Sequence, residues 1–256
     1  MIALGTGAVF GPRAAAKPVR HEQTSHSTTG AVSRGTAVGH AQSDPVTVVD
    51  FDWEYPRCPE REVSELNRYF FGELDGLNGF HVDDGSGADD VPSSCVLRSD
   101  ADEAAITSLP DGHAQQPDTL THYPDRGETI RFDHYVHREG SNMEFRFGVQ
   151  EDTESYYAVR LETDQRPTLY LLRVDAETPT PLDRIAEPMY TTGEFHRVEI
   201  EWGDEIAVTV HQNGAGPTVS ARDDAYDQGG IGFFKEETGP FRSYTHFWNN
   251  VEAVPL

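Results

Sequence analysis

Apolar residues in this chain recur at every second position in short runs, and Gly, Pro, Asn and Asp separate these runs. Such alternation is typical of β-strands that have one packed face and one solvated face. Only residues 58–70 could form a turn or two of helix, and a polar loop fits them as well. Eight runs in the second half predict strands, over residues 128–137, 142–150, 155–163, 168–175, 195–203, 205–213, 229–237 and 245–254.

Two of these runs predict which side chains face the interior. Side chains alternate along a strand, so the apolar set and the polar set must point to opposite faces. The inward set should be Met143, Phe145, Phe147, Val149, Tyr157, Val159 and Leu161. The outward set should be Glu144, Arg146, Gln150, Tyr156, Arg160 and Glu162. Antiparallel sheets with one solvated face show this split, whereas parallel sheets do not.

The first 44 residues carry no such pattern. Residues 17–44 are rich in Ser, Thr, Gly and His, and they predict a disordered linker. Residues 1–17 are apolar and rich in small side chains, like a secretory signal peptide that has lost its charged front. No Arg-Arg pair precedes them, so either the true start lies upstream or the likeness is chance. We expect export, by the twin-arginine route common in halophiles, and one β-sandwich domain over residues 45–256.

The chain is strongly acidic. Its 44 Asp and Glu residues face 20 Lys and Arg residues, of which only Lys17 and Lys235 are lysine, and the net charge is -24. Carboxylates hold water and cations at the protein surface, and concentrated salt screens the repulsion between them. A chain this acidic and this poor in lysine therefore suits a very salty interior, and we expect a haloarchaeal source. Aromatic residues make up 10% of the chain, which argues against an acidic disordered chain or a nucleic-acid mimic. We expect no nucleic-acid partner, because neutralising phosphates requires clustered Lys and Arg.

Membrane insertion and cysteine chemistry are both disfavoured. No run reaches the roughly 18 apolar residues that span a bilayer, so we predict no transmembrane segment. The two cysteines, Cys58 and Cys95, are too few for a zinc site. In an exported protein they could form one disulfide, and two free thiols are an equal alternative.

The order of the runs in the second half is specific. It reads YYAVRLE, TLYLLRV, FHRVEIEW, IAVTVHQ, YDQGGIGFF and FWNNVEAV. This order resembles the C-terminal half of the concanavalin A-like lectin and glucanase superfamily, which includes the laminin G-like jelly rolls. Asn249 stands where that superfamily usually has an aspartate. The resemblance covers residues 128–256 and implies an all-β fold, a two-sheet antiparallel β-sandwich.

That fold hosts proteins of several functions, so fold alone does not choose among them. We predict a lectin-like, carbohydrate-binding module that is secreted or attached to the cell surface, binds polysaccharide or cell-surface glycan, and has no catalysis of its own. The alternatives are a glycan-processing hydrolase or lyase on the same fold, and a structural adhesion domain. No cofactor is expected.

Sugar recognition uses planar aromatic rings together with charged and amide side chains that hydrogen-bond to hydroxyls. If the polar faces of three strands lie on one concave sheet, such residues converge there. An ordinary solvated surface is the alternative interpretation. The predicted ligand-binding residues are Arg131, Asp133, Tyr135, Glu144, Arg146, Gln150, Tyr156 and Arg160.

Two motifs hint at catalysis. The segment DFDWEYP, residues 50–56, resembles the active-site strand of TIM-barrel chitinases, which would make Glu54 the general acid. Too little chain precedes it for a barrel, so we interpret the longer segment VTVVDFDWEYP, residues 46–56, as the first strand of the sandwich and its exit turn. The laminarinase pattern Glu-x-Asp-x-x-Glu is absent, and Glu199 with Glu201 is the nearest carboxylate pair.

Other residues that could bind ligands have simpler explanations. Trp202 and Trp248 are expected to be core anchors. The eleven histidines show no metal-binding spacing. A structural calcium is what the laminin G-like resemblance implies, and carboxylate oxygens are its usual ligands. The densest acidic cluster is Asp83, Asp84, Asp89 and Asp90, which a solvated loop explains as well.

Dialysis into low salt is expected to unfold the protein, because the repulsion among its 44 carboxylates is then unscreened. Circular dichroism and tryptophan fluorescence would follow the loss of structure, and returning the sample to molar KCl should restore both signals. A protein that keeps its native spectrum in low salt would contradict the halophilic interpretation.

Overall fold

A computed structural model of the chain describes eleven stretches of residues, and for residues 61–62 and 81–83 it describes the backbone alone. The stretches are 44–49, 61–62, 80–83, 96–99, 101–110, 122–137, 139–163, 166–186, 190–211, 216–238 and 245–256. All belong to one compact unit, residues 42–256. The expectations for residues 1–43, for the DFDWEYP segment and for Cys58 and Cys95 concern parts outside the described residues.

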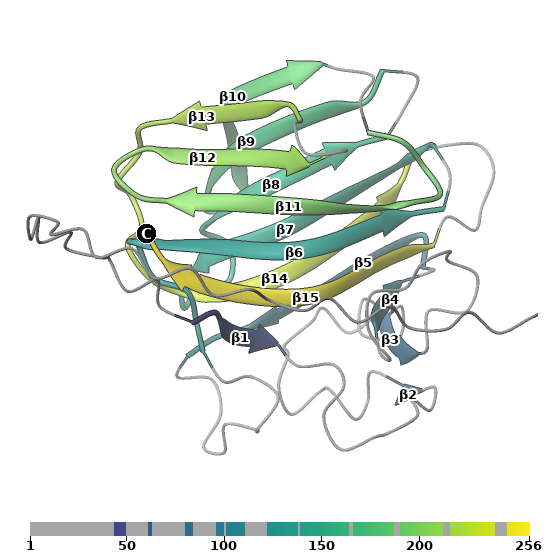
Figure 1. The fold of residues 1–256 in the computed structure, drawn as a ribbon, viewed down its shortest axis with the longest axis horizontal. Helices are drawn as coiled ribbons and strands as arrows, with labels where there is room; N and C mark the ends of the chain where they lie inside the picture. The colour runs from purple at the N-terminus through teal and green to yellow at the C-terminus, as the bar shows by residue number, and fades with distance from the viewer. Residues whose placement is uncertain are drawn as a thin grey trace, which may run out of the picture. The chain divides into compact units, whose positions relative to one another are not determined.

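The described residues form two antiparallel sheets, and no helix occurs among them (Figure 1). The first sheet has nine strands in the order β13-β12-β11-β6-β15-β4-β3-β2, with β1 paired to β15. Its strands are β1 (Val46–Val49), β2 (Arg61–Glu62), β3 (Phe80–Asp83), β4 (Val96–Ser99), β6 (Glu128–Val136), β11 (Phe195–Trp202), β12 (Ile206–His211), β13 (Thr218–Ala221) and β15 (His246–Pro255).

The second sheet has six strands in the order β10-β9-β8-β7-β14-β5. Its strands are β5 (Glu103–Ser108), β7 (Ser141–Val149), β8 (Tyr156–Glu162), β9 (Thr168–Asp175), β10 (Thr178–Ala186) and β14 (Gly230–Glu237). Figure 1 shows this sheet behind the nine-stranded one. The predicted two-sheet antiparallel sandwich is therefore confirmed, and all eight strands predicted in the second half are present.

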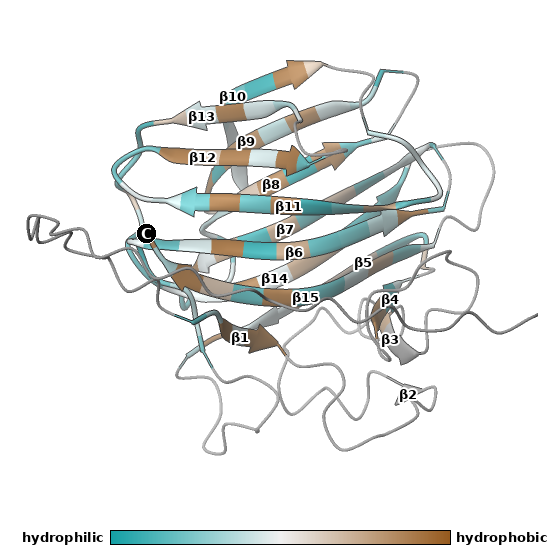
Figure 2. Cartoon of the chain, in the orientation of Figure 1, coloured by the Kyte–Doolittle hydropathy of each residue, from teal (hydrophilic) through white to brown (hydrophobic). Residues whose placement is uncertain are grey.

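Aromatic side chains join the two sheets. Phe132 of β6 stacks on Phe145 of β7 with ring centroids 4.5 Å apart, and Phe233 of β14 meets Trp248 of β15 edge to face at 5.8 Å. Trp202 and Trp248 are fully buried, as predicted for core anchors. Figure 2 shows apolar and polar residues alternating along the strands. The alternation places one apolar face of each sheet between the two layers.

Val149 is an exception to the predicted inward set. The other six residues of that set lie in the main core, but Val149 packs in a separate cluster with Tyr156, on the outer side of the six-stranded sheet. The cause is a β-bulge, because the register between β14 and β7 shifts at Gly230 and Ile231. Gly148 adopts φ +59 there, and a Cβ on it would lie 3.0 Å from the Trp202 ring. A glycine is therefore required where β7 changes face.

Strand β10 was not predicted, because its sequence TPTPLDRIA contains two prolines and lacks clear alternation. Proline has no amide hydrogen to donate, so it is confined to sheet edges and bulges. Among the described strands β10 lies at the sheet edge and pairs only with β9, and its register shifts between Pro181 and Asp183. The Asp183 carboxylate accepts a hydrogen bond from the Ser220 amide at 2.9 Å, which links β10 to β13 of the other sheet.

A chain of polar side chains crosses the core. Tyr190 contacts His134 Nδ1, His134 Nε2 lies 2.9 Å from His246 Nδ1, and His246 Nε2 lies 2.7 Å from Ser141 Oγ. His134, His246 and Ser141 are fully buried. If both rings are neutral, Tyr190 can donate to His134, His134 to His246, and His246 to Ser141. Every ring nitrogen then has a hydrogen-bond partner. The chain therefore connects β6 and β15 to β7 of the opposite sheet.

Burial lowers the pKa of both core histidines well below the ordinary value, since the interior disfavours the imidazolium. The neighbouring His246 and His196 lower the pKa of His134 further, and Lys235 does the same for His246. The folded state therefore resists protonation at both sites, whereas the unfolded chain accepts protons near pH 6.5.

As pH falls below about 6.5, folding stability should drop by about 1.4 kcal/mol per pH unit for each of His134 and His246, because only the unfolded chain gains the protons. Urea unfolding at constant high salt would measure this slope. Replacing His246 by Asn should reduce the slope of unfolding free energy against pH by about 1.4 kcal/mol per pH unit, which corresponds to one proton. The exposed His137 provides the control, and His137→Asn should leave the core contribution unchanged. An unchanged slope in His246→Asn would refute this assignment.

Candidate functional site

The eight predicted ligand-binding residues do not converge on one sheet. Arg131, Asp133 and Tyr135 lie on β6 of the nine-stranded sheet, and the other five lie on or beside β7 and β8 of the six-stranded sheet. The reason is that β6 and β7 both direct their phenylalanines into the core. Their polar faces must then point away from each other, so the predicted single concave face is wrong.

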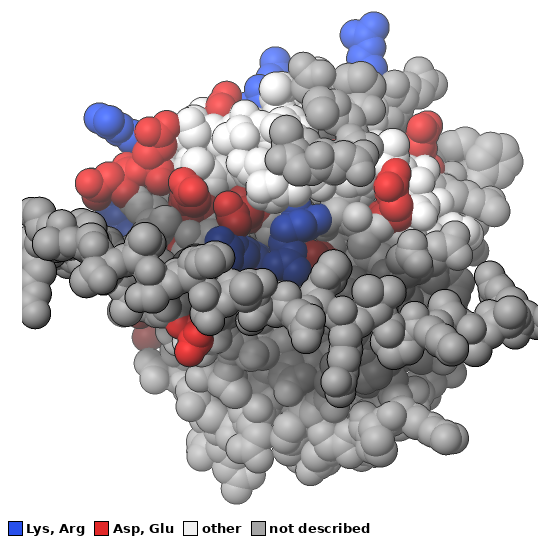
Figure 3. Space-filling model, in the orientation of Figure 1, with Lys and Arg blue, Asp and Glu red and all other residues white. Residues whose placement is uncertain are grey.

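The outer side of the nine-stranded sheet carries an alternating set of charges. Asp133 accepts two hydrogen bonds from Arg197, at 2.6 and 3.1 Å, and a third from Asn250 at 2.6 Å. Arg131 donates to Glu199 at 2.6 Å. Figure 3 shows basic and acidic side chains next to one another on this face. Arg131, Asp133, Arg197 and Glu199 are thus engaged with one another or with neighbouring residues, which leaves these side chains less available to a ligand.

Tyr135 is also occupied by neighbouring side chains. Its ring lies 5.2 Å from the Phe195 ring and 5.4 Å from the Phe247 ring, and only 3% of the residue is exposed. The three rings form a small apolar cluster with Val96. Tyr135 therefore packs with the sheet and does not offer a free ring to a sugar.

The outer side of the six-stranded sheet holds the other charged residues in one cluster. Glu144, with 1% of its side chain exposed, accepts from Arg160 Nε at 2.7 Å and from Arg146 Nε at 2.9 Å. The Arg146 guanidinium lies 4.5 Å from the centre of the Tyr156 ring and 4.9 Å from that of Phe234. This stacked arrangement fixes the Arg146 side chain between two rings.

Electrostatics explain the protonation states in this cluster. Burial acts to lower the pKa of Arg160, but the charge and hydrogen bonds of Glu144 outweigh it, and the net pKa is raised. Burial also raises the pKa of Tyr156. The cluster is therefore a fixed ion pair beside a neutral phenol, and it provides a rigid base for the adjacent surface.

A pocket of about 620 Å³ lies at one end of the six-stranded sheet, where the antiparallel order brings the ends of β5 and β7 beside the start of β14. Gln150 is the only predicted ligand-binding residue in its wall. The apolar cluster of Val149 and Tyr156, with Leu109, connects the pocket to the Arg146 stack. The described lining consists of Leu109, Pro110, His122, Tyr123, Asp125, Val149, Gln150, Glu151, Gln228 and Gly229.

Hydrogen bonds hold three walls of this pocket in place. The Tyr123 hydroxyl donates to the Leu109 carbonyl at 2.9 Å and lies 2.7 Å from Ser108 Oγ. His122 Nε2 lies 2.8 and 3.0 Å from the two oxygens of Glu128. Gln150 Nε2 donates to the Gly148 and Gln228 carbonyls at 2.8 and 3.0 Å. That leaves Gln150 Oε1 without a partner among the described residues, so it can accept from a ligand.

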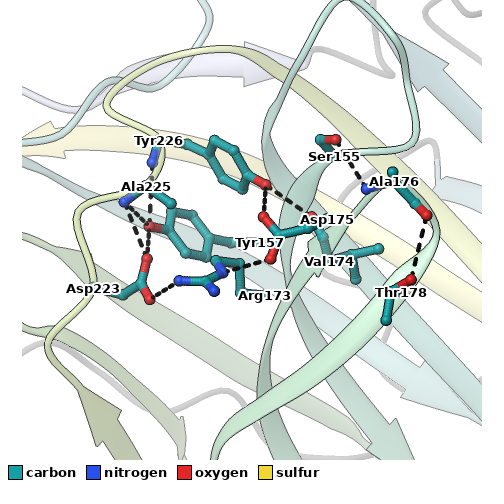
Figure 4. A network of polar contacts seen from close by, with 10 residues as sticks. All are labelled: Ser155, Tyr157, Arg173, Val174, Asp175, Ala176, Thr178, Asp223, Ala225 and Tyr226. Carbon is teal, nitrogen blue, oxygen red and sulfur yellow. Dashed lines mark hydrogen bonds and ion pairs between the residues drawn. The ribbon is translucent and has the colours of Figure 1, made fainter.

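The fourth wall, at Gln228 and Gly229, follows the segment 223–226, which hydrogen bonds attach to β8 and β9 (Figure 4). Asp223 accepts from the Tyr157 hydroxyl at 2.5 Å and from Arg173 Nη1 at 2.7 Å. Gly229 has φ +153, and a Cβ there would lie 2.5 Å from the Val149 carbonyl oxygen. Glycine is thus required for the wall to lie against the end of β7.

Tyr226 also attaches this segment to β9. The Tyr226 hydroxyl lies 2.6 Å from Asp175 Oδ1 and 2.9 Å from the Val174 carbonyl. Burial and the bond to Asp175 raise the pKa of Tyr226 to about 12, and the same bond lowers the pKa of Asp175. Near neutral pH the Tyr226 phenol is therefore neutral and the Asp175 carboxylate is ionised, so their hydrogen bond persists.

Other candidate chemistry is not supported by the geometry. Ser141 and His246 have the spacing of a nucleophile and its base, but both are fully buried and no substrate can reach them. Glu199 is paired with Arg131. No group of three or more His, Cys, Asp or Glu among the described residues is placed to hold a metal ion. The side chains of the acidic cluster at residues 83–90 lie outside the described set.

Sequence reasoning missed most of the pocket. His122, Tyr123, Asp125 and Glu151 lie between strands, where no periodicity marks them. The pair Gly229 and Gly230 was the one available signal, because adjacent glycines before a strand indicate a close approach of backbones.

The chain is similar to solved structures of low sequence identity. No protein-family model matches the sequence, and no curated protein matches it. β-Agarase B from Zobellia galactanivorans superposes with a TM-score of 0.52 at 10% identity, over 83% of this chain and 93% of that one. The module CBM66 from Bacillus subtilis gives 0.46 at 12% identity, over 62% and 86%. A Bacillus subtilis protein of unknown function with a galectin-like fold gives 0.47 at 13% identity, over 78% and 96%.

The likeness to β-agarase B is one of fold, since the identity is only 10%. It is consistent with the predicted two-sheet β-sandwich. The described part of the chain contains no helix long and apolar enough to cross a membrane. The chain therefore has the two-sheet jelly-roll fold, and its function must be argued from the pocket.

Proposed function

We propose that this chain is a carbohydrate-binding module that holds a glycan, without cleaving it, in the pocket at the end of the six-stranded sheet. The observation that carries the proposal is the pocket itself, in which hydrogen bonds to the surrounding chain hold the side chains of His122, Tyr123 and Gln150 in place. The strongly acidic composition supports a halophilic setting, and the signal-like start of the chain supports a secreted or cell-surface location.

The size and lining of the pocket suit a sugar. A volume of about 620 Å³ lies within the usual range for small-molecule sites, about 300 to 1,000 Å³. Tyr123 and His122 offer planar rings, and Leu109 and Val149 offer apolar surface. Sugars present both apolar C–H faces and hydroxyl edges, which such a mixed lining can contact.

Three side chains of the pocket wall are held in place. Tyr123 and Gln150 each make two hydrogen bonds to the surrounding chain, and His122 Nε2 makes one bifurcated contact with the Glu128 carboxylate. Ordering of side chains costs free energy on binding, so a wall that is already ordered favours affinity for a weakly binding ligand such as a sugar. On the outer side of the nine-stranded sheet, by contrast, Arg131 and Arg197 are already bound to Glu199 and Asp133.

Alanine substitutions on the two sheets should locate the site. His122 in the pocket and Arg131 on the opposite face are matched, because 29% and 30% of their side chains are exposed and each pairs with a glutamate. His122→Ala should weaken glycan binding about tenfold, through the loss of one ring contact and one hydrogen bond. Arg131→Ala should change binding less than about twofold. Binding of the full chain to a polysaccharide and oligosaccharide array in molar NaCl measures both.

Three results would contradict the proposal. Release of reducing sugar in the same buffer would make the protein a glycan-processing enzyme. Absence of binding to every glycan would favour a structural adhesion domain. A larger effect of Arg131→Ala than of His122→Ala, with both variants folded by circular dichroism, would move the site to the nine-stranded sheet.

A further inference from the structure

The hydrogen-bonding groups around the pocket are predominantly acceptors. Asp125 and Glu151 are exposed carboxylates in the lining, and an ionised carboxylate can only accept. Gln150 turns its amide donors toward the Gly148 and Gln228 carbonyls, so its oxygen remains for a ligand. Among the described lining residues, the Gln228 side-chain amide is a neutral donor. A ligand that brings its own donors is therefore complementary to this wall.

His122 adds to the same character. Its Nε2 faces the two Glu128 oxygens at 2.8 and 3.0 Å. In the neutral ring, donation from Nε2 leaves a lone pair on Nδ1. The Tyr123 hydroxyl donates to the Leu109 carbonyl, so its proton is also engaged. Neither aromatic residue therefore has a free side-chain donor when the His122 ring is neutral.

No lysine or arginine lines the described part of the pocket. The adjacent Arg126 directs its guanidinium to the Gly203 carbonyl and to Asp227, at 3.1 and 2.9 Å. Arg146 and Arg160 are bound to Glu144. The eleven residues 111–121, which connect Pro110 to His122 along the chain, contain two aspartates and no Lys or Arg. The carboxylates of the lining therefore lack a neighbouring cation to neutralise them among the described residues.

We infer that the pocket selects neutral or amine-bearing sugars and rejects uronate and sulfate-bearing ones. This inference rests on the proposed glycan binding. Sugar hydroxyls and ammonium groups donate hydrogen bonds to Asp125, Glu151 and Gln150. An ionised uronate or sulfate group brings only acceptors. Beside Asp125 and Glu151 it would lose its water without gaining a hydrogen-bond donor, which costs binding free energy.

The selectivity persists in concentrated salt. The Debye length at molar salt is about 3 Å, so long-range repulsion from the net charge of the chain is screened there. The mismatch of acceptor against acceptor acts at hydrogen-bond distance, which salt screens far less. Discrimination in molar salt therefore reports the pocket and not the overall acidity.

The test uses the full chain in molar NaCl and an array in which each glycan backbone appears in neutral, amino, uronate and sulfated forms. Neutral and amino forms should bind at least about tenfold more tightly than the acidic forms of the same backbone. The double variant Asp125→Asn and Glu151→Gln should reduce this ratio to less than about threefold, because each new amide can donate. The control pair Glu199→Gln and Glu252→Gln, on the nine-stranded sheet, should leave the ratio unchanged.

The outcomes separate this inference from the proposed function. Binding of acidic forms as tightly as neutral ones would overturn the inference while the carbohydrate-binding function stands. A preference for neutral forms that survives the double variant, with that variant folded by circular dichroism, would also overturn it, since Asp125 and Glu151 would not be its source. Failure to bind any glycan in any form would overturn the proposed function and the inference together.

Discussion

The packing of Phe132 on Phe145 is the contact on which the arrangement of this protein depends. The two residues belong to β6 and β7, strands that follow each other in sequence but lie in opposite sheets. Burying both rings between the layers places the two polar faces on opposite sides of the molecule. It also brings the start of β6 and the end of β7 to the same end of the sandwich. The pocket forms at that end.

A second constraint comes from the polar chain that runs through the apolar interior. The buried His134 and His246 must be neutral and fully hydrogen-bonded, because an unsatisfied polar group in the core costs about 1 to 3 kcal/mol. Such a chain tolerates only one relative placement of β6, β15 and β7. It therefore adds specificity to a core whose aromatic packing supplies most of the stability.

The pocket depends on both constraints and on two glycines. Gly148 lets β7 change face, which turns Val149 outward toward the pocket, and Gly229 lets the opposite wall lie against it. Hydrogen bonds from Tyr157 and Arg173 to Asp223 then hold the segment before β14 in place. Recognition groups thus sit on loops, while the sheets beneath them supply the rigidity.

The sequence by itself determined the fold class and most strand positions, because alternation of apolar residues is a local property of each strand. It also identified Trp202 and Trp248 as core residues and the charged faces of β6, β7 and β8. Only the tertiary structure decided which sheet each strand joins, and hence that Arg131 and Arg160 lie on opposite faces. The pocket was equally beyond the sequence, since His122, Glu151 and Gln228 come from separate loops that meet only when the sheets pack.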